Sequence, residues 1–200
     1  MNSFQAYLIL GFDHITDLNG YDHILFIVAL CAIYQLTDWK RILILVTAFT
    51  IGHSVTLALA TLQVFTYRSD VIELLIPVTI LATALSNLFH RFPKNTYSYT
   101  KPDKPHYLRY LFALAFGLIH GLGFSNFLRS LLGREESIVQ PLLAFNIGLE
   151  LGQLIIVGIF VLVCTLINRI FSVNQRDWNL VLSGAVAGIS LILIQKAWIF

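Results

Sequence analysis

The sequence predicts an all-α fold, a polytopic membrane bundle of about six transmembrane helices. Hydrophobic residues make up 57% of the 200 positions and charged residues only 12%, which is typical of membrane proteins. The mean hydropathy is correspondingly positive, at +0.76. Long apolar segments alternate with short connections that contain charged residues, prolines or turn-forming residues. These observations indicate that most of the chain lies within a bilayer.

Six segments are long enough to cross a hydrocarbon core of about 30 Å at about 1.5 Å per residue. In chain order they cover approximately residues 20–37, 41–64, 71–91, 108–132, 138–168 and 178–199. The fifth segment exceeds the length that one span needs, so we expect it to tilt or to project beyond the membrane. We expect residues 1–200 to form one integral membrane domain.

Basic residues predict the orientation, because cytoplasmic connections carry an excess of Lys and Arg. Most of the 13 Lys and Arg residues flank alternate connections on one side: Lys40, Arg41, Arg91, Lys94, Lys101, Lys104, Arg109, Arg169 and Arg176. We therefore expect that side, with the extended loop 92–107, to be cytoplasmic. Both termini should then face outward, and the acidic Asp13 and Asp17 should meet incoming solutes first. The expected location is a bacterial inner (cytoplasmic) membrane.

The composition also narrows the range of partners. The net charge of +2 is too small to suggest nucleic acid, and the sequence has no Gly-rich phosphate loop of the Walker or dinucleotide type. Cys31 and Cys164 both lie inside apolar runs, where a thiol behaves as a small hydrophobic group and no disulfide framework is indicated. The expected partners are a metal ion as substrate and membrane lipids.

Ionisable residues inside membrane segments are costly and usually functional. His23, His53, His120 and Glu150 fall at one depth of the predicted bundle, towards the outer side of four different helices. These helices can therefore converge on one outward-facing site. A single histidine could serve helix packing alone. Three at one depth with a carboxylate favour a functional cluster, because each buried polar group adds a desolvation cost.

The fifth predicted helix carries the clearest polar stripe, because Asn146, Glu150 and Gln153 share one helical face. Beside that face, Gly148 and Gly152 permit the close approach of a neighbouring helix. The expected metal ligands are His23, His53, His120, Glu150 and Asp22. The residues expected to attract the ion or to support its ligands are His14, Asp13, Asp17, Ser54, Asn146 and Gln153.

This set of side chains indicates a divalent transition metal ion. Imidazole suits zinc, copper, nickel and iron, and a carboxylate completes a mixed shell of nitrogen and oxygen ligands. Ligand type alone does not choose among these metals, so the sequence leaves both nickel and zinc as expected occupants.

Four stretches in the same order on successive helices resemble the HupE/UreJ family. They are GYDHILF at 20–26, TAFTIGHSVTLALA at 47–60, FGLIHGLGF at 116–124 and FNIGLELGQL at 145–154. The resemblance implies a permease of about six to eight helices, associated with hydrogenase and urease systems, that admits nickel and in some cases cobalt. The compact chain is more similar to the second subgroup of that family than to the signal-bearing form.

The family pattern in the first helix has a histidine five residues before an Asp-His pair. In this chain seven residues separate His14 from Asp22. The resemblance therefore extends directly to Asp22 and His23. His14 does not match the pattern, and we expect it to attract the ion rather than to bind it with the other histidines.

Two hypotheses from different classes follow. The first is a permease for a divalent transition metal cation, with nickel favoured and cobalt next, in which the outward-facing cluster dehydrates and binds the ion. The second is a membrane-embedded, zinc-dependent hydrolase of a lipid or another membrane substrate, with three histidines on zinc and Glu150 or Asp22 as general base. A third, structural role would use the polar cluster only to hold four helices together.

Overall fold

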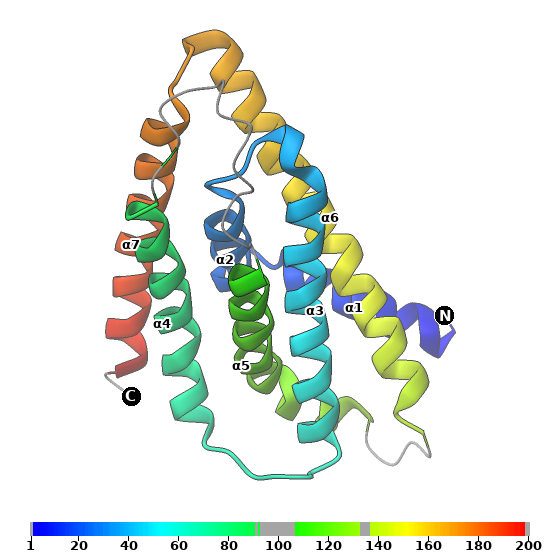
Figure 1. Cartoon of the computed structure of the whole chain (residues 1–200). Helices are drawn as coiled ribbons and strands as arrows, with labels where there is room; N and C mark the ends of the chain where they lie inside the picture. The colour runs from blue at the N-terminus through cyan, green and yellow to red at the C-terminus, as the bar shows by residue number, and fades with distance from the viewer. Residues whose placement is uncertain (1, 91, 93–106, 133–136, 199–200) are drawn as a thin grey trace.

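The computed structural model describes residues 2–90, 92, 107–132 and 137–198. These residues form seven α-helices and one 3-10 turn, without a β-strand among them (Figure 1). Five helices are long and apolar enough to cross a membrane: α3 (Trp39–Thr61), α4 (Ser69–Leu88), α5 (Tyr107–Leu132), α6 (Val139–Phe171) and α7 (Gln175–Trp198). The predicted all-α membrane bundle is confirmed.

The five long helices agree with five predicted spans to within three residues at each end. Helix α6 has 33 residues and is inclined relative to α3 (Figure 1). Most of the predicted cytoplasmic loop 92–107 lies outside the described residues, as do Arg91, Lys94, Lys101 and Lys104. The predicted orientation of the bundle therefore stays a prediction.

The predicted first span, 20–37, differs from the structure. Its helix, α2 (Asp22–Cys31), has 10 residues and rises about 15 Å, half of a hydrocarbon core. A 3-10 turn, η1 (Leu36–Asp38), then leads into α3. The described part of the chain thus has five long spans and one short apolar helix in place of six full spans. Helix α2 ends at Cys31, and the apolar Ala32 and Ile33 that follow it conceal this end from a hydropathy analysis.

A further helix, α1 (Ser3–Thr16), precedes the first predicted span and was missed. Its start carries a capping box, in which the Asn2 side chain accepts from the Phe4 amide and the Gln5 side chain accepts from the Asn2 amide. These bonds satisfy amides that the first helical turn leaves free. Helix α1 lies across the bundle rather than along it (Figure 1).

Helix α1 is held against α6 by backbone contact at glycines. A Cβ atom on Gly148 would meet the carbonyl oxygen of Leu8 and would lie 2.9 Å from the amide nitrogen of Phe12. A Cβ atom on Gly11 would likewise meet the carbonyl group of Phe145. The close neighbour that the sequence predicted beside Gly148 is therefore α1.

Helices α3 and α5 pack in the same way. A Cβ atom on Gly117 would meet the Phe49 carbonyl oxygen, and one on Gly121 would meet the carbonyl oxygen of His53. Small residues of this kind let membrane helices approach until their backbones touch. The contact at Gly121 brings the second half of α3 next to the part of α5 that contains His120.

Buried apolar residues form two clusters on either side of the histidines. One lies where α1 meets α6 and includes Phe145, and the other joins α2 to α5 and includes Phe26 and Phe49. The ring of His53 stacks on Phe145 at 6.2 Å between centroids, while His120 lies 5.2 Å from both Phe26 and Phe49. The histidines therefore occupy the junction between the two apolar clusters.

We predict that Gly148→Ala destabilises the protein because the added methyl group collides with the backbone of α1. The cost should be about 1–3 kcal/mol, seen as a lower apparent Tm of the purified protein in detergent. Gly158→Ala is the matched control, since a Cβ atom on Gly158 of the same helix has no atom within 4 Å among the described residues. Equal Tm values for the two variants would contradict the α1–α6 contact.

Candidate metal centre

Helices α1, α2 and α3 each contribute one histidine to a group of potential metal ligands. A ring nitrogen from each of His14 on α1, His23 on α2 and His53 on α3 lies within 4.8 Å of the other two. The His14 and His23 ring centroids are 4.7 Å apart, and those of His14 and His53 are 6.0 Å apart. His53 is fully buried and His23 is 6% exposed. We call these three residues the histidine group.

The histidine group presents ring nitrogens without hydrogen-bond partners among the described residues. These atoms are Nε2 of His14, Nε2 of His23 and both ring nitrogens of His53. Burying a polar atom without a hydrogen-bond partner costs free energy, so such an atom in a folded protein usually binds a water molecule or an ion. Unpartnered imidazole nitrogens in close proximity suit a transition metal ion.

Asp22 fixes the orientation of His23. Its Oδ1 atom lies 3.0 Å from Nδ1 of His23 and also accepts the His23 backbone amide at 2.9 Å. A carboxylate that accepts from Nδ1–H leaves the lone pair of Nε2 available, which is the usual support of a metal-binding histidine. The sequence predicted Asp22 as a ligand, whereas the structure places it behind His23.

His120 on α5 lies next to the histidine group but is not a member of it. Its ring centroid is 5.2 Å from that of His23, and Thr79 Oγ1 lies 3.2 Å from its Nε2. Because the Thr79 hydroxyl donates its only proton to the Ile76 carbonyl at 2.7 Å, Nε2 of His120 must be the donor to Thr79. The lone pair of His120 Nδ1 is then available, and Nδ1 has no partner among the described residues.

The polar stripe of α6 meets threonines of α3 instead of the histidines. Glu150 accepts a hydrogen bond from the Thr47 hydroxyl at 2.7 Å, and Gln153 accepts one from Thr50 at 2.6 Å. Among the described residues, Glu150 belongs to no group of potential ligand atoms. Glu150 was predicted to join the histidines as a metal ligand. The structure instead places its carboxylate against Thr47.

The other predicted supporting residues lie in different surroundings. Asn146 Oδ1 and Gln153 Nε2 are buried and have no partner within the described chain. Ser54 donates to the Thr50 carbonyl at 2.6 Å, within its own helix. Asp13 is exposed, and so is Asp17, which accepts from the Asn19 amide at 2.8 Å and so closes the turn between α1 and α2.

An open cavity of about 370 Å³ lies between the start of α2, the first half of α4 and the end of α7. Its charged lining residues are Asp22, Glu73 and Lys196. Asp22 thus faces the cavity and also holds His23. The sequence analysis did not assign Glu73 to the site, although a carboxylate early in an apolar helix is the kind of residue that can signal one.

The position of His14 is the other feature that was missed. His14 and His23 lie on different helices, because α1 ends at Thr16 and the chain turns before α2 begins at Asp22. This turn folds the two helices together, so His14 meets His23 although the spacing differs from the family pattern. The signal in the sequence was the turn-forming stretch DLNG at 17–20.

We predict that His14→Ala weakens binding of Co²⁺ to the purified protein as strongly as His53→Ala does. Either change removes a member of the histidine group, and the expected loss of affinity is at least about tenfold. The intensity of the Co²⁺ visible absorption bands measures binding. His90→Ala is the control, because His90 contacts Arg109. Unchanged binding in His14→Ala would exclude His14 from the ligands.

One family model matches the chain. It is described as HupE / UreJ protein, and the match covers residues 1–200. No curated protein and no solved structure matches the chain.

Proposed function

Because the chain belongs to the HupE/UreJ family, known as nickel and cobalt accessory permease-like membrane proteins, we propose that it is a permease for a divalent transition metal cation. Nickel is the favoured substrate and cobalt the next. The observation that carries this proposal is the histidine group, in which one ring nitrogen of each histidine lies within 4.8 Å of the other two. Four ring nitrogens of the group have no hydrogen-bond partner among the described residues. We place the protein in a bacterial cytoplasmic membrane.

In this proposal the cation reaches the histidine group through the open cavity at the start of α2. Two carboxylates, those of Glu73 and Asp22, and the single ammonium group of Lys196 line that cavity. The resulting net negative charge raises the local concentration of cations. Asp22 accepts from His23, so the ion passes from a carboxylate-lined opening to imidazole ligands over a short distance. A membrane potential that is negative inside favours further inward movement.

The chemistry of the histidine group suits transient binding. Three neutral imidazoles bind nickel and cobalt well but do not neutralise the charge of the ion, whereas carboxylate or thiolate ligands would. The only carboxylate hydrogen-bonded to the group within the described residues is Asp22, behind His23. A cation is therefore bound firmly enough to lose water and weakly enough to leave. His120, with its available Nδ1 lone pair, is the next ligand along the bundle.

Aromatic side chains close the path beyond His120. Phe26 lies 5.0 Å from Phe49 and 5.9 Å from Phe116 between ring centroids, and its own ring packs on His120. Since these rings fill the space between α2, α3 and α5, release to the other side requires a rearrangement of the helices. We propose that this aromatic layer is the inner barrier of an alternating-access cycle.

We predict that cells producing the wild-type protein accumulate ⁶³Ni²⁺ and that His53→Ala reduces this uptake at least about tenfold, because a buried ligand is lost. Immunoblots normalise uptake to the amount of protein in the membrane. Thr165→Ala is the control, since the Thr165 hydroxyl donates within α6, to the Val161 carbonyl at 2.7 Å. Equal uptake by wild type and His53→Ala would contradict the proposal.

The metal content of the purified protein distinguishes the permease from the alternative function, a zinc-dependent hydrolase. A zinc-dependent hydrolase would retain about one tightly bound zinc per chain through purification, as catalytic zinc sites with three protein ligands do. Inductively coupled plasma mass spectrometry measures this metal without any addition. Retained zinc together with absent nickel uptake would overturn the permease and favour the hydrolase.

A further inference from the structure

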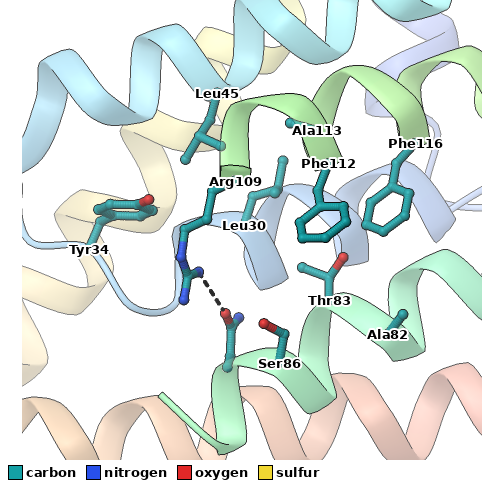
Figure 2. Close-up of a pocket in the computed structure, with 11 residues that line it drawn as sticks. Leu30, Tyr34, Leu45, Ala82, Thr83, Ser86, Arg109, Phe112, Ala113 and Phe116 are labelled. Atoms are coloured by element: carbon teal, nitrogen blue, oxygen red, sulfur yellow. Dashed lines mark hydrogen bonds between the residues drawn. The ribbon is translucent and has the colours of Figure 1, made fainter. Parts of the chain in front are cut away.

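A second cavity, of about 280 Å³, lies between α2, α3, α4 and α5 (Figure 2). Its lining residues Leu30, Leu45 and Ala113 lie about one helical turn beyond the aromatic residues of their helices, on the side away from the histidines. Its walls are mostly apolar and include Leu30, Leu45, Ala113 and Phe116. Its volume is near the lower end of the range of ligand-binding pockets, about 300–1,000 Å³. The histidines do not line this cavity, and Phe116 is the residue that it shares with the aromatic layer.

The side chain of Arg109 extends into this cavity (Figure 2). Its guanidinium group donates to Asn87 Oδ1 at 3.3 Å and lies 3.3 Å from His90 Nδ1. Neither contact is with a carboxylate, and the ion pairs found within the described residues involve other side chains. A half-buried guanidinium carries five N–H donors and a full charge, so it favours an anionic partner.

The fold holds Asn87, and with it Arg109, in a fixed position. Asn87 is buried, and its side-chain amide donates to the Ala29 carbonyl of α2 at 2.6 Å. The backbone carbonyl of Asn87 accepts a hydrogen bond from the side-chain amide of Asn179 on α7 at 2.8 Å. With its amide group fixed by α2 and its backbone by α7, Asn87 directs Oδ1 towards Arg109. The cation is therefore a built part of the cavity and not a surface residue that moves freely.

The cavity opens sideways between α4 and α5. Ala82 and Ser86 of α4 and Phe112 of α5 line it and are also exposed on the outside of the bundle. In a chain that spans a membrane, this flank faces lipid. Arg109 is the third residue of α5 and lies at the end of the bundle that carries Lys40 and Arg41, the depth of lipid headgroups on the predicted cytoplasmic side.

We propose that this cavity binds one anionic phospholipid, with the phosphate group on Arg109 and the start of an acyl chain between Leu30, Leu45 and Phe116. Basic pockets between helices at the cytoplasmic face are the usual sites of acidic headgroups. An apolar wall beside a single fixed cation fits a molecule that is anionic at one end and hydrocarbon at the other. A hydrated inorganic anion would not use the apolar wall.

The test is native mass spectrometry of the detergent-purified full chain, titrated with phosphatidylglycerol or with phosphatidylcholine of the same acyl chains. We expect one phosphatidylglycerol to bind in preference to phosphatidylcholine by about fivefold. Arg109→Gln should abolish this preference, and Arg109→Lys should retain most of it. Ser86→Trp, which fills the opening of the cavity, should reduce binding of the first phosphatidylglycerol.

Two matched controls should behave as wild type. Arg129→Gln removes an exposed cation from the other end of α5, and Leu85→Trp places the same large side chain at an exposed position of α4 that does not line the cavity. An undiminished preference in Arg109→Gln, or an equal loss in Arg129→Gln, would overturn the proposal. Displacement of the bound lipid by an equal concentration of palmitate would also overturn it and would assign the cavity to free fatty acids.

Discussion

Backbone contact between helices at glycine residues fixes how α1 packs on α6 and how α3 packs on α5, and the histidine group depends on both contacts. Gly117 and Gly121 bring α5 against α3 near His53, and Gly11 and Gly148 bring α1 against α6. In a bilayer, packing and hydrogen bonds provide most of the attraction between helices, so close approach matters more than it does in water. Without these contacts His14 and His53 would not face each other, and the histidine group would not form.

Bringing imidazoles together in an apolar interior is unfavourable unless the nitrogens find partners. The structure meets this cost in part through Asp22, which accepts from His23, and through Thr79, which accepts from His120. Five other ring nitrogens have no partner among the described residues: Nε2 of His14 and of His23, both nitrogens of His53, and Nδ1 of His120. That arrangement is what a site for a passing cation requires, because the oriented lone pairs are ready and a weakly held ion can leave. The aromatic rings around them exclude water and separate the group from the cavity that contains Arg109.

Much of the fold could be predicted from the sequence, because hydropathy and span length determine where apolar helices lie. The shared depth of His23 and His53 also followed from the span ends, and their ring centroids are 6.4 Å apart. The place of His14 could not be predicted, since it depends on a turn between two short helices. Glu150 bonds to Thr47 because of the rotation and tilt of α6, and one sequence does not specify either of these.

The most direct test of the central claim is X-ray absorption spectroscopy at the nickel edge on the purified protein loaded with one Ni²⁺ per chain. The claim is that His14, His23 and His53 bind the ion together. We predict the multiple-scattering pattern of at least two imidazole ligands, with a smaller imidazole contribution in both His14→Ala and His23→Ala. A spectrum with oxygen ligands only, or one that neither substitution changes, would contradict the account.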